Sequence, residues 1–123
     1  MAISSAHGDA AELGAKLFRG FADPMRLAIL WALARREKRV VDLVSELGTS
    51  QPNASGHLAC LKDCGLVIAR PEGRQMFYRI SSPEILDLLT AAERVLATHG
   101  RRVRLCPRYA TRSAKRAGAR DRR

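Results

Sequence analysis

The stretch "VDLVSELGTSQPNASGHLACLKDCG", residues 41–65, decides the fold because it predicts two helices separated by a tight turn. Its first part, 41–47, has the apolar spacing of a short helix, and Gly48 is suited to end that helix in the left-handed conformation. The second part, 50–63, starts with polar residues and continues with an apolar stripe. A short helix, a turn and a second helix of this kind are typical of a helix-turn-helix.

The N-terminal turns of this second helix carry polar side chains suited to reading DNA. A recognition helix places these turns in the major groove, where short polar groups meet phosphates and base edges. Asparagine and glutamine can each form two hydrogen bonds with adenine, while serine and threonine suit phosphates. The candidate DNA-binding residues here are Thr49, Ser50, Gln51, Asn53, Ser55 and His57. The alternative is that these side chains only cap a surface helix.

The flanking segments complete a winged helix-turn-helix, a mainly α fold with about five helices and a β-hairpin. The helices are predicted over residues 10–21, 24–36, 41–47, 50–63 and 83–99. Asp23 lies at an N-cap position, and Pro24 occupies the first helical position, where its missing N–H costs least. Two β-prone runs, "LVIAR" and "QMFYRI", are joined by "PEGR" and predict a two-stranded wing.

The predicted wing is positively charged, with Arg70, Arg74 and Arg79 against Glu72. A basic ribbon beside a recognition helix suits contact with the DNA backbone or the minor groove. Arg70 and Arg74 are therefore candidate DNA-binding residues, and Arg74, at the predicted tip, is the preferred phosphate contact. The alternative is that these arginines are the ordinary exposed positions of a hairpin.

The composition indicates a soluble protein with one domain. A chain of 123 residues, 46% hydrophobic and 28% charged, can form one modest core. Its first twenty residues lack a basic region followed by an apolar segment, and no apolar run is long enough to span a bilayer. We therefore expect a cytoplasmic protein with reduced thiols and no membrane partner.

The formal charge of +10 is concentrated at the C-terminus. Residues 101–123 carry ten Lys or Arg against one acid, which leaves about +1 for residues 1–100. Such a tail attracts phosphate backbones but does not by itself identify a nucleic-acid-binding protein. We expect a flexible N-terminus at 1–9, a DNA-binding and dimerisation domain at 10–100, and a basic tail at 101–123 that carries Cys106.

Three blocks, "FADPMRLAILWAL", "TSQPNASGHLACLKDCGLV" and "RPEGRQMFYRI", resemble the signature blocks of the ArsR/SmtB metal-sensing repressors, in the same order and spacing. The resemblance covers about residues 10–100. It implies a homodimer, joined through its first and last helices, that binds double-stranded operator DNA and blocks transcription. The apolar stripes at 13–21 and 85–96 agree, because both exceed what one small core requires. Gly56 departs from the pattern, since relatives usually carry a polar side chain there, and the operator sequence stays open.

The cysteines are the candidate sensor residues. Cys60 and Cys64 lie four residues apart on the predicted recognition helix, so their side chains are adjacent and can bind one soft ion. Cys106 lies in the Arg-rich tail. The alternative for the pair is core packing, because a free cysteine is usually a small buried hydrophobic residue.

The pattern "HLACLKDCGLV" with a cysteine in the tail resembles the CmtR-type cadmium/lead sensors within this family. That implies a metal site of Cys60, Cys64 and Cys106, with Cys106 supplied in cis or from the partner subunit. Three thiolates suit Cd²⁺, Pb²⁺ or As(III) as inducer; Zn²⁺ is possible but normally seeks a fourth ligand, for which His57 is nearest. No organic cofactor is expected, and no catalytic set indicates an enzyme.

Two other functions stay open at this point. A repressor of the same fold could sense oxidation through a disulfide between Cys106 and Cys60 or Cys64. Alternatively, the basic tail could drive non-specific binding to nucleic acid, in which case deletion of residues 107–123 would abolish binding.

Overall fold

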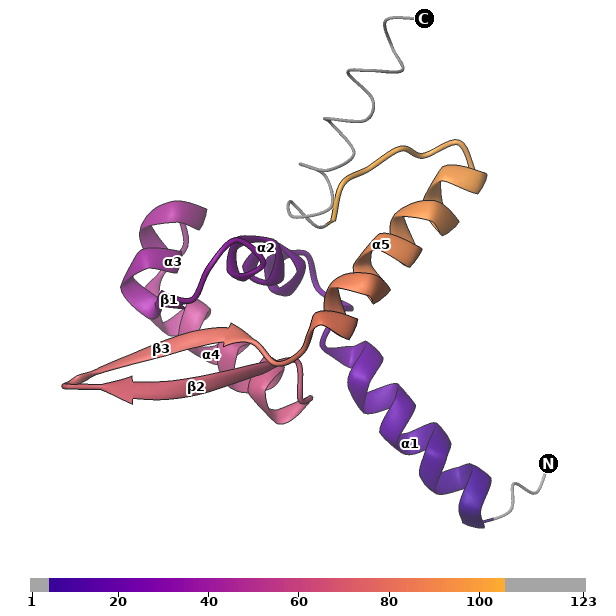
Figure 1. The fold of residues 1–123 in the computed structure, drawn as a ribbon, viewed down its shortest axis with the longest axis horizontal. Coiled ribbons are helices and arrows are strands. Elements are labelled where there is room, and N and C mark those ends of the chain that lie inside the picture. Colours follow the sequence, from indigo (N-terminus) through magenta and orange to yellow (C-terminus); the bar gives the residue numbers. More distant parts are fainter. Residues whose placement is uncertain (1–4, 106–123) are drawn as a thin grey trace, which may run out of the picture.

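The computed structural model describes residues 5–105 and shows the winged helix-turn-helix predicted from the sequence (Figure 1). In chain order the elements are α1 (Ser5–Arg19), α2 (Pro24–Leu33), β1 (Lys38–Arg39), α3 (Val40–Leu47), α4 (Gln51–Asp63), β2 (Val67–Glu72), β3 (Gln75–Ile80) and α5 (Pro83–Thr98). The sheet and the helices α2, α3 and α4 form the body, while α1 and α5 extend away from the tip of the wing. Among the helices of this part of the chain, all are too short or too polar to cross a membrane.

Local sequence signals set the helix boundaries around the helix-turn-helix. The Asp23 carboxylate accepts two backbone N–H groups at the start of α2, at 2.8 and 3.1 Å, and Pro24 follows in the first turn. Gly48 ends α3 with a φ of 64°, the left-handed conformation expected of it. The Ser50 hydroxyl accepts the Asn53 N–H at 3.2 Å and caps α4. These caps confirm the predicted boundaries because they act within a few residues.

Two other helix ends differ from the prediction. The helix α1 begins at Ser5 and includes residues 5–9, which we expected to be flexible. Ala6 in this segment and Ala10 and Ala11 directly after it favour the helix. The helix α2 ends at Leu33, before the predicted end near Arg36. The chain leaves the helix there because the following residues turn to pair with the wing.

The predicted two-stranded wing is confirmed as the hairpin of β2 and β3, and the sheet has a third strand that was not predicted. The short strand β1 pairs with β3 and gives an antiparallel sheet of order β1-β3-β2. In it, Lys38 lies opposite Tyr78, and Arg39 lies opposite Phe77. Two charged residues have no β pattern of their own. Their conformation depends on pairing with a strand that is distant in the sequence.

The core lies between α2, α4, α5 and the inner face of the sheet. On α4, the predicted stripe is confirmed, since Ala54, Leu58 and Leu61 are fully buried. On α2, the helical spacing of Leu27, Leu30, Trp31 and Ala34 predicts one buried stripe, but only Leu30 is buried and the other three are half-buried. The other buried residues of α2 are Ile29, Ala32 and Leu33. The buried face is rotated because α2 packs against α3, α4 and β3 together.

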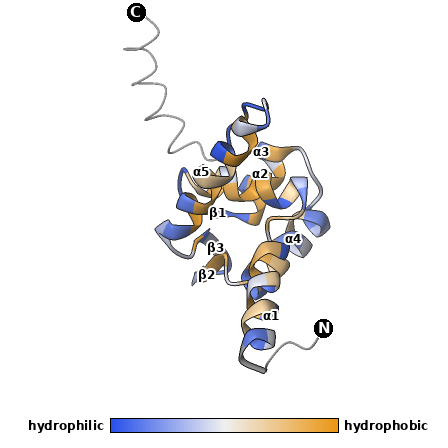
Figure 2. Cartoon of the chain, turned by 90° about the vertical axis from the view of Figure 1, so that its right-hand side faces the viewer, coloured by the Kyte–Doolittle hydropathy of each residue, from blue (hydrophilic) through white to orange (hydrophobic). Residues whose placement is uncertain are grey.

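The helices α1 and α5 carry apolar side chains that one chain leaves uncovered. Leu13 and Phe18 on α1 are 71% and 59% exposed, and Val95 on α5 is 59% exposed. Figure 2 shows apolar segments along α1, which projects from the body. Removing such surface from water is favourable, so both helices are suited to pack against another surface.

Candidate DNA-binding surface and thiol pair

The first turns of α4 expose most of the side chains predicted to bind DNA. Ser50, Gln51, Asn53 and Ser55 are exposed, while Thr49 is half-buried. The Asn53 amide donates a hydrogen bond to the Thr49 hydroxyl at 2.7 Å, which fixes the amide on the outer surface. The amide nitrogen of Asn53 has a second hydrogen to donate, and the amide oxygen can accept. Asn53 therefore keeps the donor and the acceptor with which it can bind adenine.

His57, the remaining candidate on α4, turns inward and contacts the corner between α1 and α2. Its side chain is 20% exposed, and its Nε2 lies 3.7 Å from the Asp23 carboxylate. Its Nδ1 lies 3.5 Å from Arg26, whose guanidinium also donates to the Arg19 and Gly20 carbonyls at the end of α1. The Arg26 N–H, followed by the facing charge of His57, holds the pKa of Asp23 below its ordinary value. His57 therefore connects α4 to this corner.

The two arginines predicted to bind DNA have different surroundings in the wing. Arg74 is exposed at the hairpin turn, beside Gly73 with a φ of 62°. The Arg70 guanidinium instead donates two hydrogen bonds to the Glu37 carboxylate, one of them from Nε at 3.0 Å. It also lies 4.9 Å from the centre of the Phe77 ring. Arg70 is thus engaged within the molecule, and Arg74 is presented to solvent.

Three consecutive charged residues, 37–39, connect the wing to α3 and were not among the predicted site residues. Their ion pairs and hydrogen bonds are Glu37–Arg70, Lys38–Glu46, Arg39–Asp42 and Arg39–Gln75. Lys38 is only 4% exposed, and its ammonium pairs with the partly exposed carboxylate of Glu46. The Arg39 guanidinium and N–H lower the pKa of Asp42 to about 2. The spacing of Arg39 and Asp42, three apart at a helix start, was the signal available in the sequence.

The thiols of Cys60 and Cys64 are adjacent at the rear of α4, as predicted from their spacing. Cys60 is half-buried in the helix, and Cys64 is buried at its C-cap. Burial raises the pKa of the Cys64 thiol, and the neighbouring Cys60, which forms a hydrogen bond with it, raises it further. Both side chains pack with the hydrophobic core. The pair therefore combines the two interpretations left open by the sequence, since it belongs to the core and presents two soft donors together.

The third predicted ligand, Cys106, lies outside the described residues. Within residues 5–105, no group of three or more His, Cys, Asp or Glu side chains is placed to hold a metal ion. The last described residue, Leu105, is half-buried and packs against the core, and its N–H donates to the Glu93 carboxylate of α5. The chain after α5 thus folds back along the helix toward α2 (Figure 1).

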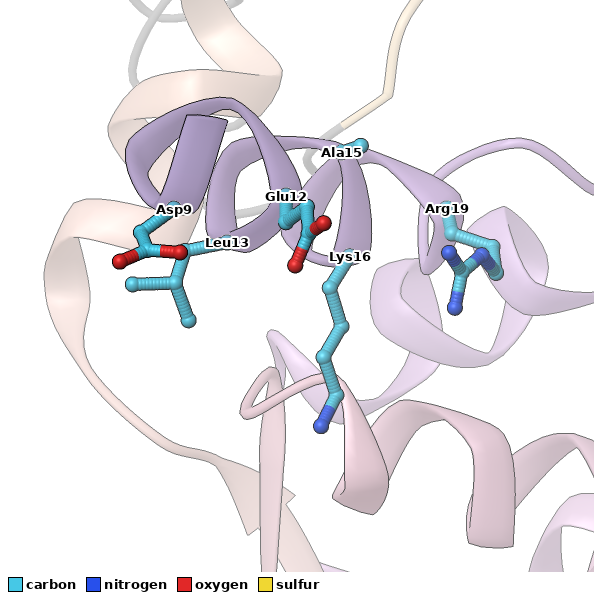
Figure 3. Close-up of a pocket in the computed structure, with 6 residues that line it drawn as sticks. All are labelled: Asp9, Glu12, Leu13, Ala15, Lys16 and Arg19. Atoms are coloured by element: carbon cyan, nitrogen blue, oxygen red, sulfur yellow. The ribbon is translucent and has the colours of Figure 1, made fainter. Parts of the chain in front are cut away.

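The end of α1 approaches the thiol pair. The Lys16 ammonium lies 3.7 Å from the Asp63 carboxylate in the last turn of α4, and Figure 3 shows this side chain extending from α1 in that direction. The charge of Arg19, near the end of α1, lowers the pKa of Cys64 and so partly offsets the effect of burial. A depression of about 590 Å³ on this side is lined by α1 alone, so it remains open.

Comparison with known proteins identifies the family. A family model described as bacterial regulatory protein, arsR family, matches residues 23–69. The chain is 38% identical over 94 residues to a probable mercury resistance operon repressor of Streptomyces lividans, and the match covers 76% of this chain and 75% of that protein.

Solved structures of similar proteins agree with the fold. A homodimeric winged helix-turn-helix DNA-binding domain from Mycobacterium bovis is 32% identical, with a TM-score of 0.72 over 80% of this chain and 93% of that one. The cadmium sensor CMTR of Mycobacterium tuberculosis is 40% identical, with a TM-score of 0.55 over 63% of this chain and 80% of that one. The chain belongs to the arsR family of bacterial regulatory proteins, as a winged helix-turn-helix DNA-binding regulator and not an enzyme.

Proposed function

We propose that the protein is a repressor that binds operator DNA as a homodimer and releases it when a soft, thiophilic metal ion binds its cysteines. One observation carries the proposal: the adjacent thiols of Cys60 and Cys64 lie at the rear of the helix that exposes DNA-reading side chains at its front. The similarity to a mercury resistance operon repressor and to a cadmium sensor supports a metal as the inducer.

In the DNA-bound state, the front of α4 would enter the major groove. Ser50 and Ser55 suit phosphates, whereas Gln51 and Asn53 have the paired donor and acceptor needed to read adenine. The positive end of the helix dipole favours the same approach to the phosphate backbone. Arg74 at the tip of the wing would add a phosphate contact beside the groove.

The proposed dimer joins α1 and α5 of two copies. Leu13, Phe18 and Val95 are the large apolar side chains exposed on the described part of these helices. Phe18 also lines an apolar depression of about 180 Å³ between the end of α1 and α5, which a partner helix would cover. Two-fold symmetry would then present two copies of α4 to successive turns of the major groove, about 34 Å apart.

The proposed metal ligands are Cys60, Cys64 and, from the tail, Cys106. Two adjacent thiols fit a soft ion because sulfur ligands select such metals over hard ones. When bound, the ion would link the end of α4 to the tail. Both thiols must lose their protons to bind the ion. Because Cys64 does so while buried in the core, metal binding would change the packing of the last turn of α4.

The surroundings of the thiols favour Cd²⁺ or Pb²⁺ as the inducer. A tetrahedral zinc site would require a fourth ligand, and His57 was the nearest candidate. His57 is held by Asp23 and by the cationic Arg26, whose charge opposes a metal ion there. As(III) fits the same trigonal set of three thiolates.

A redox switch receives less support from the structure. Oxidation requires an accessible thiolate, and burial raises the pKa of the Cys64 thiol, which disfavours that form, whereas a binding metal ion displaces the proton itself. Non-specific binding through the tail is likewise less supported, because the front of α4 exposes Gln51 and Asn53, which can form hydrogen bonds with base edges.

The test is Cys60→Ser, which removes one ligand and keeps the shape of the helix. We expect the variant to bind a duplex enriched from a random library by the unaltered protein, and to stay bound when Cd²⁺ is added. The unaltered protein should lose roughly 5- to 150-fold in affinity, the range of about 1–3 kcal/mol typical of allosteric coupling. Release of the variant at the same Cd²⁺ concentration would contradict the proposed site.

A further inference from the structure

We propose that Arg70 positions the wing for DNA binding instead of contacting DNA, and that Glu37 is its anchor on the body. The inference rests on the proposed DNA binding and assigns separate roles to the two wing arginines. Arg74 supplies the phosphate contact, and Arg70 fixes where Arg74 lies.

The first argument is the face of the sheet on which Arg70 lies. Along β2, Val67 is buried against the core and Ile68 is exposed, so alternation places Arg70 on the outer face. Phe77 pairs with Arg70 across the sheet, and Arg39 pairs with Phe77 in turn, so the three side chains form one row on that face. It is the face opposite the one that carries the buried Val67.

The second argument is the charge around the guanidinium. Glu37 accepts hydrogen bonds from Nε and from a terminal nitrogen, and Glu72 lies 3.6 Å away on the same strand. The hydrogen bonds from Arg70 also hold the pKa of Glu37 below its ordinary value, so the carboxylate stays charged at neutral pH. A phosphate approaching Arg70 would meet both carboxylates and would have to displace a bidentate partner.

The third argument is mechanical. Glu37 precedes β1 and holds β2 through Arg70, while Arg39 at the end of β1 holds β3 through Gln75 at 3.2 Å. Arg39 also binds Asp42 in the first turn of α3 at 2.8 Å. Glu37 thus ties β2 to the segment of β1, and Arg39 ties β3 and that segment to α3, which a short turn connects to α4. This arrangement sets the direction of the wing relative to the recognition helix.

The salt dependence of DNA binding separates the two roles. Each phosphate contact contributes about 0.9 to the slope of log affinity against log salt concentration. With the enriched duplex as probe, we expect Arg74→Ala to reduce the slope by about that amount. Arg70→Ala should lower affinity and leave the slope unchanged. A slope reduced equally by Arg70→Ala would overturn the inference.

A charge swap provides the matched rescue. Glu37→Arg combined with Arg70→Glu preserves an ion pair and the net charge, so affinity lost in either single variant should return in the pair. Arg70→Lys keeps the charge but loses the bidentate fork, so its affinity should fall while its slope stays unchanged. Failure of the swap to restore affinity, with Arg70→Lys fully active, would show that Arg70 acts as a charge toward DNA.

A measurement without DNA distinguishes this inference from the proposed function. Residual dipolar couplings of the amides in β2 and β3, relative to those in α2 and α4, report the orientation of the wing in the free protein. Arg70→Ala should change that orientation, and Arg74→Ala should not. An unchanged orientation in Arg70→Ala would refute the positioning role, whereas failure of the unaltered protein to enrich any duplex would refute DNA binding alone.

Discussion

The two ends of α4 differ in almost every physical property, although one helix of 13 residues contains both. The front exposes polar side chains around the Ser50 cap, with Ala54 as its buried contact. The rear buries Leu58, Leu61 and Cys64 in the core. A change at the rear alters packing, whereas a change at the front alters only what the surface can bind. One continuous helix joins them, so packing at the rear sets the direction of the front.

The largest expected effect comes from shortening a buried side chain at the rear of α4. Leu61→Ala should lower the free energy of unfolding by about 2–5 kcal/mol, because Leu61 is fully buried and its removal leaves a cavity. Urea unfolding at fixed protein concentration measures this change. The front control, Ser55→Ala, should change stability by no more than about 0.5 kcal/mol. Equal losses in the two variants would remove the distinction between the ends.

The next largest effect is expected from the loss of a contact between the front of α4 and the DNA bases. Asn53→Ala should weaken binding to the enriched duplex by about 1–3 kcal/mol, because it removes a side chain that can pair with a base edge. Fluorescence anisotropy measures the affinity. Discrimination against an unrelated duplex should fall with it. If affinity for both duplexes fell by the same factor, Asn53 would be a contact without base preference.

A smaller effect is expected at Gly56, which lies between the two ends. Gly56→Ala should raise the free energy of unfolding by about 0.5–1 kcal/mol, because alanine loses less conformational entropy in a helix. A Cβ added there meets no atom within 4 Å, so no clash offsets the gain. Thermal unfolding followed by circular dichroism tests this expectation, and a lowered midpoint would contradict it.

The smallest effect concerns the pH dependence of the ion pair between Arg39 and Asp42 at the start of α3. The pKa of Asp42 is lowered from its ordinary value of 3.8 to about 2, so its ion pair with Arg39 stabilises the folded state above pH 3.8. This contribution is lost as the pH falls from 3.8 toward 2, and it lies within the range of about 0–1 kcal/mol for exposed pairs. Asp42→Asn should flatten the acid side of a stability profile. An unchanged profile would show that the pair contributes nothing.

The sequence predicted the helix-turn-helix well because its signals are local. Ser50 and Gly48 act within a single turn, and the spacing of Cys60 and Cys64 makes them neighbours in any helix. The strand β1 was missed because its two residues become a strand only by pairing with β3. The inward orientation of His57 was missed for the same kind of reason, since Asp23 and Arg26 reach it from another helix.

The different roles of the two wing arginines could not be predicted from the sequence pattern. Arg70 and Arg74 are equally basic in sequence, and both suited a phosphate. The partner that separates them is Glu37, whose contact with Arg70 requires the fold to bring residues 33 positions apart together. An exposed hairpin position was one of the two interpretations of Arg70, but nothing in the pattern indicated the carboxylate that binds its guanidinium.

The most direct test of the account is the reciprocity between the two ends of α4. The affinity for the enriched duplex is measured with and without saturating Cd²⁺, and the affinity for Cd²⁺ is measured with and without the duplex. We expect both ratios to be the same factor, roughly 5 to 150, because coupling between two sites is reciprocal. In Cys64→Ser both ratios should equal one. Cd²⁺ that binds Cys60 and Cys64 while the affinity for DNA stays unchanged would contradict the account.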